Sequence, residues 1–133
     1  MAQRRYFRQI IIRYIMFPKE EDNDAELEWV FKCLGLGDDA DEVGKSIFRA
    51  LVRSAKKGEG ISSRELMEDI PVTQAAIVYH LNNFMRSGLV VKHGRSYMLR
   101  GGSLQHALDE IENDMVRRMG QLKEIAKKIE EGS

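Results

Sequence analysis

The chain has 133 residues and carries 21 basic and 21 acidic side chains, so its formal net charge near neutral pH is zero. This length allows one small domain with an appended helix, whose modest core leaves room for a dimer interface to supply stability. The lone cysteine, Cys33, excludes an internal disulfide framework and suits a reducing cytoplasm, and since no apolar run approaches the roughly 20 residues that span a bilayer, neither a membrane helix nor a secretory signal is expected.

Residues 1–43 are expected to form an N-terminal helical extension. An apolar stripe at helical spacing favours a helix over residues 5–17, although the β-branched and aromatic content of this segment equally suits a strand. Pro18 ends this element, and Asn23 or Asp24 can cap the following helix. The apolar positions of that second helix are Leu27, Val30, Phe31 and Leu34.

The next helix is expected to begin at two consecutive acidic residues. Asp38 and Asp39 can cap it, and Lys56 and Lys57 lie in its last turn, where positive charge complements the helix dipole. Gly58 ends it. Its apolar positions recur every four residues and are Val43, Ile47, Leu51 and Ala55.

The segment 61–100 is the most informative part of the sequence, because it predicts two short helices joined by a tight turn. Ser62 or Ser63 can cap the first helix, and Pro71 ends it, since proline disfavours helical geometry at the residue before it. Thr73 can cap the second helix, which is expected to stop at the next glycine.

Two β-rich runs, 89–91 and 97–99, follow with a turn at 93–95, so a short hairpin is expected. A second helix held at an angle on a first, with a hairpin behind it, is how winged helix-turn-helix modules present a helix to the DNA major groove. The expected fold is therefore mainly α with a small β-hairpin. A winged helix-turn-helix DNA-binding domain is predicted over residues 44–101, and a C-terminal dimerisation helix over residues 102–133.

The same segment resembles the ArsR-type winged-helix transcriptional regulators, and their archaeal relatives in particular. The residues that carry the resemblance are Thr73-Gln74, Ile77, His80-Leu81, Phe84, Gly88-Leu89-Val90, Gly94-Arg95 and Tyr97. It extends over roughly residues 44–130 and does not explain the first 43; one departure is the short hairpin. The resemblance implies a homodimeric transcriptional regulator that binds double-stranded DNA.

Charge is segregated along the chain although its total is zero. Residues 19–44 carry ten acidic side chains against two lysines, whereas residues 45–100 carry ten basic side chains against four acidic ones. The positive block coincides with the predicted DNA-binding segment, as contact with phosphates requires. Clustering of surface charge by chance would give the same asymmetry, so this feature adds weight to the motif and does not stand alone.

The exposed face of the predicted recognition helix carries side chains suited to reading bases. Gln and Asn can bond adenine edges, Val and Ala methyl groups can contact thymine methyls, and Tyr can reach a phosphate. The predicted base-contact residues are Gln74, Ala75, Val78, Tyr79 and Asn82. The predicted phosphate contacts are Arg64, Thr73, Arg86, Lys92 and Arg95. Because this face holds few basic residues, a winged-helix protein-interaction module without specific DNA binding is the alternative.

The tail from Ser103 to Glu131 is predicted to be one long helix. Its apolar residues alternate at spacings of four and three, the pattern of a coiled coil, which Arg118 interrupts. A domain this small cannot cover such a stripe, so pairing with a second copy is predicted; folding back on the N-terminal helices is the alternative. The predicted dimer-interface residues are Leu104, Leu108, Ile111, Met115, Met119, Leu122, Ile125 and Ile129.

No residue grouping predicts catalysis or a cofactor. The sequence offers no Ser-His-Asp arrangement, Gly-rich phosphate loop or paired catalytic carboxylates, so an enzyme is not expected. Thiolate metal sites need several cysteines, and Cys33 fits a core position instead. His106 with Asp109 or Glu110 makes only a partial ligand set, so a metal or small-molecule effector is left open without being favoured. His80 is expected to be structural, bonding across the two-helix unit.

Overall fold

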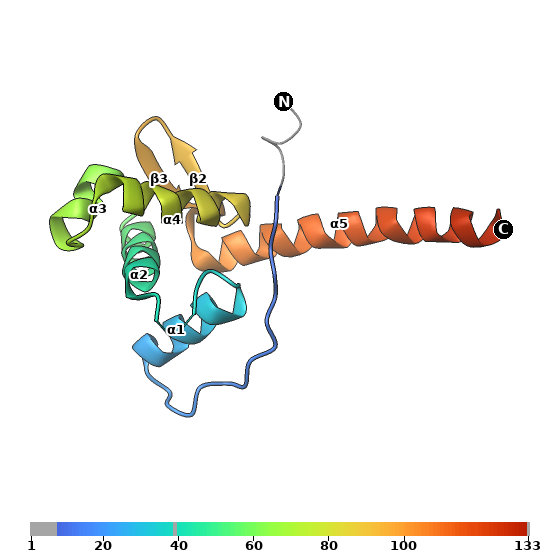
Figure 1. Cartoon of the computed structure of the whole chain (residues 1–133), viewed down its shortest axis with the longest axis horizontal. Coiled ribbons are helices and arrows are strands. Elements are labelled where there is room, and N and C mark those ends of the chain that lie inside the picture. The colour runs from blue at the N-terminus through green and yellow to red at the C-terminus, as the bar shows by residue number, and fades with distance from the viewer. Residues whose placement is uncertain (1–7, 39, 133) are drawn as a thin grey trace.

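The computed structural model describes residues 8–38 and 40–132 (Figure 1). The helices in these residues are α1 (Asn23–Cys33), α2 (Glu42–Lys56), α3 (Ser63–Asp69), α4 (Gln74–Arg86) and α5 (Leu104–Glu131). The strands are β1 (Ile61–Ser62), β2 (Val90–His93) and β3 (Ser96–Leu99), and a short 3₁₀ turn, η2 (Arg100–Gly102), leads into α5. The chain is thus mainly helical with a small antiparallel sheet and a long C-terminal helix, which confirms the coarse fold prediction.

The N-terminal strap, residues 8–18, is extended and contains neither helix nor strand. Figure 1 shows it crossing α5 and reaching α1. The helix predicted over residues 5–17 is therefore wrong from residue 8 onward, and its first three residues lie outside the described part of the chain. Backbone N–H groups of Gln9 and Arg13 donate to carbonyls at the ends of α4 and α1, at 3.0 and 2.7 Å. These contacts, with the preference of β-branched residues for extended backbone, outweigh the helical spacing of the apolar side chains.

Two helix caps differ from the prediction. α1 is capped by Asp22, which directly precedes the predicted candidates Asn23 and Asp24, and α2 is capped by Asp41 rather than Asp38. Asp39 lies outside the described residues. Both segments offer several neighbouring acidic residues that can cap a helix, so packing of the helix on the core selects among them.

The predicted boundaries of the two-helix unit are confirmed. Ser62 and Glu65 form a reciprocal capping box at the start of α3, with N···O distances of 3.1 and 2.9 Å. The Thr73 hydroxyl accepts a hydrogen bond from the Ala76 N–H at 3.1 Å and so caps α4. Gly88 follows α4 with a φ of +88°, a conformation that favours glycine.

The sheet has the order β1-β3-β2 and is antiparallel throughout. Gly94 and Arg95 form the hairpin turn, and His93, predicted in the turn, is the last residue of β2 and pairs with Ser96. The sequence did not predict β1, because two residues are too few to display an alternating pattern. Ile61 of β1 pairs with Tyr97, which joins the start of the two-helix unit to the hairpin.

One apolar core spans most of the chain. Ile77, Leu81 and Phe84 of α4 are fully buried, and the Phe31 ring of α1 lies 6.4 Å from the Phe84 ring. Ile111 of α5 belongs to the same cluster, so the three predicted segments share a core. None of the described helices combines the length and the apolar character needed to cross a bilayer.

α5 has 28 residues and is about 40 Å long at 1.5 Å per residue. Its first turns pack on the core through Ala107 and Ile111, whereas every residue from 115 to 132 is exposed. Figure 1 shows this second part projecting away from the other helices. The long helix is therefore confirmed, and its exposed part does not fold back on the described N-terminal residues.

Candidate nucleic-acid interface

The side chains predicted to contact bases gather on one face of α4. Gln74, Ala75, Tyr79 and Asn82 are exposed and Val78 is half-buried. Ala75, Tyr79 and Asn82 lie away from the buried residues of the same helix, and Gln74 and Val78 lie at the edge of that face, because positions three, four and seven residues apart share one side of a helix. The structure therefore brings the five predicted residues together on a surface open to a ligand.

Gln74, at the first turn of α4, already has a partner. Its amide Nε2 donates to the Ser63 hydroxyl of α3 at 2.9 Å. The bond uses one amide hydrogen, which leaves a second N–H and the carbonyl oxygen for an adenine edge. It links the two helices at the end of α4 where recognition helices approach bases. The sequence did not indicate this bond, because the two residues are eleven positions apart.

The predicted phosphate contacts are more widely spread. Arg64 is exposed on α3, and Lys92 and Arg95 are exposed on the hairpin, with the Lys92 ammonium 5.2 Å from the centre of the Tyr97 ring. Thr73 is exposed and uses its hydroxyl oxygen for the α4 cap. Arg86 lies in the last turn of α4, about 18 Å along the axis from the first residue of that helix, at 1.5 Å per residue.

Part of the positive block pairs within the chain. The Lys45 ammonium is buried 3.2 Å from carboxylate oxygens of Glu28 and Glu42, and the Arg49 guanidinium lies 3.3 Å from Asp24. The acidic segment that precedes the block thus neutralises some of it. Seven other cationic residues of the block form no ion pair with a carboxylate in residues 8–38 or 40–132: Arg53, Lys56, Lys57, Arg64, Arg86, Lys92 and Arg95.

Burial and ion pairing act in opposite directions on Lys45. Desolvation disfavours its charged form, but hydrogen bonds to Glu28 and Glu42, together with their negative charges, more than offset that cost and raise the pKa of Lys45. Lys45 therefore holds α1 against α2 as a charged group and is not available to a ligand.

His80 connects α4 to the start of α2. Its Nδ1 lies 3.8 Å from the Asp41 carboxylate that caps α2, and its ring lies 5.4 Å from the Tyr79 ring. The distance to Asp41 exceeds that of a hydrogen bond, so the two groups attract only when the imidazole is protonated. This places His80 between helices, on the side of α4 away from the predicted base-contact residues.

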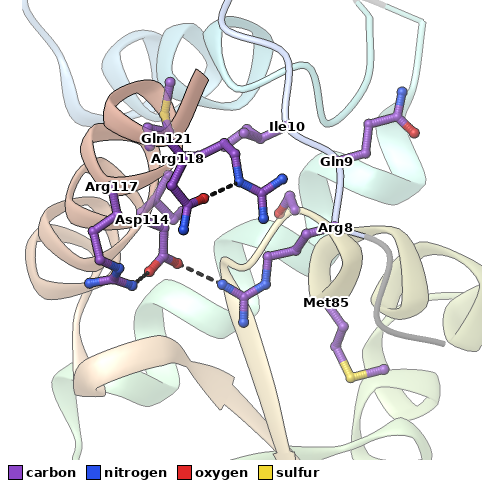
Figure 2. A pocket seen from close by; sticks show the side chains of 11 residues that line it. Arg8, Gln9, Ile10, Met85, Asp114, Arg117, Arg118 and Gln121 are labelled. Atoms are coloured by element: carbon purple, nitrogen blue, oxygen red, sulfur yellow. Dashed lines mark hydrogen bonds and ion pairs between the residues drawn. The ribbon is translucent and has the colours of Figure 1, made fainter. Parts of the chain in front are cut away.

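A pocket of about 790 Å³ lies at the far end of α4, between the strap and α5. Figure 2 shows Arg8 of the strap and Arg117 of α5 converging on Asp114, with Met85 of α4 on the opposite wall. Arg8 and Arg100 share one carboxylate oxygen of Asp114 at 2.6 and 2.7 Å, and Arg117 binds the other at 2.6 Å.

Three guanidinium groups around one carboxylate perturb its titration. The hydrogen bond from Arg100, with the positive charges of Arg100, Arg8 and Arg117, lowers the pKa of Asp114 despite its partial burial. Arg100 also binds Glu110 at 2.8 Å. This cluster fixes the strap and the hairpin end to the root of α5; sequence periodicity gave no sign of it, because Arg8 and Asp114 are 106 residues apart.

The predicted dimer-interface residues divide into two groups. Leu104 and Leu108 are half-buried and Ile111 is buried, all three against the core of their own chain. The remaining five are all exposed: Met115, Met119, Leu122, Ile125 and Ile129. The first four of these form what we call the free stripe.

Arg118 interrupts the predicted heptads but lies beside an unbroken apolar path. Met115, Met119, Leu122, Ala126 and Ile129 succeed one another at spacings of four, three, four and three along the exposed helix. The Arg118 Nε donates to Gln121 at 2.9 Å, on the flank of that path. The exposed part of α5 therefore keeps a complete coiled-coil repeat without a buried arginine.

No group of three or more His, Cys, Asp or Glu side chains in the described part of the chain is arranged to hold a metal ion. His106 lies 3.1 Å from the Ser103 hydroxyl at the start of α5. Cys33 is a half-buried free thiol at the end of α1.

Comparison of the chain with protein-family models, with curated proteins and with solved structures found no match. Function must therefore be inferred from these surfaces.

Proposed function

We propose that the chain is a sequence-specific, double-stranded DNA-binding transcriptional regulator that acts as a homodimer. In this proposal α3 and α4 form the helix-turn-helix and β2 and β3 form a short wing. α4 enters the major groove, and the wing contacts the DNA backbone.

The exposed face of α4 is the observation that carries the proposal. It presents amide, methyl and phenol groups, which are those that read base edges and thymine methyls. Arg64 on α3 and Lys92 and Arg95 on the hairpin are exposed on elements next to α4, and they supply positive charge for contact with a duplex backbone.

The free stripe supports the homodimer. Two recognition helices must lie about 34 Å apart to reach successive major grooves on one face of the duplex. A pair of α5 helices joined through Met115, Leu122 and Ile125 would hold two domains at a fixed distance. The pairing would also remove from water an apolar surface that the chain itself leaves uncovered.

A selection from random duplexes, followed by a salt titration on the selected sequence, tests the proposal. If a dimer neutralises about six to ten phosphates, affinity should fall by roughly 10³ to 10⁵ between 50 and 200 mM salt. A selected site with two related halves would support the dimer. Absence of binding at 50 mM salt would contradict the proposal and would favour an interaction module that uses the acidic segment 19–44 and α5.

A further inference from the structure

The strap has two unlike edges. Its contacts with the domain involve backbone groups of odd-numbered residues: Gln9 N–H to Arg86 C=O (3.0 Å), Arg13 N–H to Cys33 C=O (2.7 Å) and Trp29 Nε1–H to Ile15 C=O (3.1 Å). The Ile11 carbonyl oxygen also faces the domain, 3.0 Å from the position that a Cβ on Gly35 would take. In extended backbone, successive residues direct their N–H and C=O groups to opposite edges. One edge of the strap is therefore used by the chain.

The other edge is unpaired. The backbone N–H and C=O groups of Ile10, Ile12 and Tyr14 form no hydrogen bond with any residue that the structure describes. The Tyr14 side chain is 99% exposed, and that of Ile12 is 41% exposed. A row of free donors and acceptors on an apolar, β-branched segment is a template for another strand.

We propose that this edge pairs with the strap of a second copy of the chain, as an antiparallel two-stranded ribbon centred on Ile12. Ile12 then lies opposite the partner's Ile12, and Ile10 lies opposite the partner's Tyr14. Each of these pairs exchanges two N–H···O=C bonds, because the even-numbered backbone groups face outward on both straps.

The side chains fit this register. Arg13 lies opposite the partner's Ile11 and Arg8 opposite the partner's Met16, so no two arginines oppose each other. The pairs of Ile10 with the partner's Tyr14 combine a β-branched and an aromatic side chain, which stabilises antiparallel ribbons. The next two registers toward the C-terminus are worse: one opposes the two copies of Arg13, and the other places Pro18, which lacks an N–H, opposite Ile10.

The occupant is a second copy because the sequence pairs with itself without a charge conflict. This edge consists of backbone groups of the strap and contains no residue of the free stripe of α5, although Ile10 and Met115 line the same pocket. The strap crosses α5 at its root, where Arg8 binds Asp114, whereas the free stripe begins at Met115 and runs outward. Strap pairing therefore does not depend on the DNA proposal.

Disulfide trapping tests the register. In a Cys33→Ser background, Ile12→Cys should form a covalent dimer under mild oxidation, because Cα atoms of a hydrogen-bonded pair lie about 5.5 Å apart, within the range for a disulfide. Tyr14→Cys is the matched control. In the proposed register the two positions 14 lie four residues apart along the ribbon, roughly 13 Å, although position 14 is far more exposed than position 12.

We expect the Ile12→Cys link to form at least about tenfold faster than the Tyr14→Cys link, because pairing supplies a high local concentration. Equal rates, or a faster link at position 14, would show random collision and overturn the proposal. The two cysteine variants are then compared in a Leu122→Asp background, which removes any contribution of α5 pairing to the rate of disulfide formation. If Ile12→Cys still links faster than Tyr14→Cys in this background, the strap interface is supported. If the two rates become equal, the strap does not form an interface independent of α5. Neither outcome depends on how this background binds DNA.

Discussion

α4 and the outer part of α5 have apolar residues at the same helical spacing, yet only those of α4 are covered. Ile77, Leu81 and Phe84 are fully buried, whereas Leu122 and Ile129 are 55% and 63% exposed. A spacing of three and four residues therefore predicts a helix with one face that needs cover. It does not tell whether the cover comes from the same chain or from another one.

Along α5, the change from buried to exposed apolar side chains occurs between Ile111 and Met115. Ile111 is 5% exposed and Met115 is 42% exposed. Between them lies Asp114, held by three arginines from the strap, the η2 turn and α5 itself. The root of α5 thus belongs to the domain, and the free stripe begins where these ion pairs end.

Truncation of a covered residue should have the largest effect on folding. Phe84→Ala removes a fully buried ring that contacts the Phe31 and His80 rings. We expect the free energy of unfolding to fall by about 3–5 kcal/mol, from lost burial and a cavity. Urea denaturation followed by circular dichroism measures it.

Leu122→Ala is the control for that truncation. Because its side chain is more than half exposed, we expect a change within roughly 0.5 kcal/mol at a protein concentration where the chain is monomeric. If Leu122→Ala lowers the free energy of unfolding as much as Phe84→Ala does, the free stripe is covered within one chain.

A charge on the free stripe should separate folding from assembly. Leu122→Asp would bury a carboxylate in an apolar interface, and we expect it to weaken the dimer by at least about 3 kcal/mol, or more than a hundredfold in Kd. Sedimentation should then show a monomer with an unchanged circular dichroism spectrum and with much weaker binding to the selected DNA.

Gln121→Asp is the matched control, because it adds the same charge one residue away and off the free stripe. It should remain a dimer. If Leu122→Asp also stays a dimer at micromolar concentration, the α5 interface is refuted.

Variants on α4 and on the hairpin should separate base reading from phosphate binding. Gln74→Ala or Asn82→Ala should cost about 1–3 kcal/mol on the selected duplex and relax the choice at one base pair. Arg95→Ala should weaken all sequences about equally and flatten the salt slope by roughly one. Competition binding against single-base variants of the duplex distinguishes the two patterns. A uniform loss from both α4 variants would mean that this helix does not read bases.

Local chemistry explains which features the sequence could predict. The capping box of Ser62 and Glu65 and the cap of Thr73 act over three residues, so their residue types suffice to place α3 and α4. The exposure of most of the predicted base-contact residues follows from the same periodicity that locates the buried residues of α4.

The features that the sequence did not predict depend on distant partners. The strap is extended because carbonyls at the ends of α1 and α4 bind it, although its own apolar spacing favours a helix. Lys45 can be buried as a charged group because Glu28, 17 residues earlier, accepts a hydrogen bond from its ammonium. Neither contact leaves a periodic trace, and no motif connects the residues involved.

Removing the ion pairs of Asp114, at the boundary between the buried and the exposed part of α5, should have the smallest effect on the free energy of unfolding. This effect should depend on pH. Because the arginines lower the pKa of Asp114 in the folded chain below the ordinary value of 3.8, the stabilisation is present above that value and is lost as the pH falls through it toward the lowered pKa. Asp114→Asn should therefore reduce stability by roughly 1 kcal/mol at pH 7, given the partial exposure of the pair, and by less at pH 3. Urea unfolding at both pH values measures the difference, with Asp109→Asn, an exposed acid on the same helix, as the control. If the loss of unfolding free energy is the same at both pH values, or equal for the two variants, the arginines do not stabilise the root of α5 through the Asp114 charge. The boundary between the buried and the exposed part of α5 would then come from the packing of Ala107 and Ile111 alone.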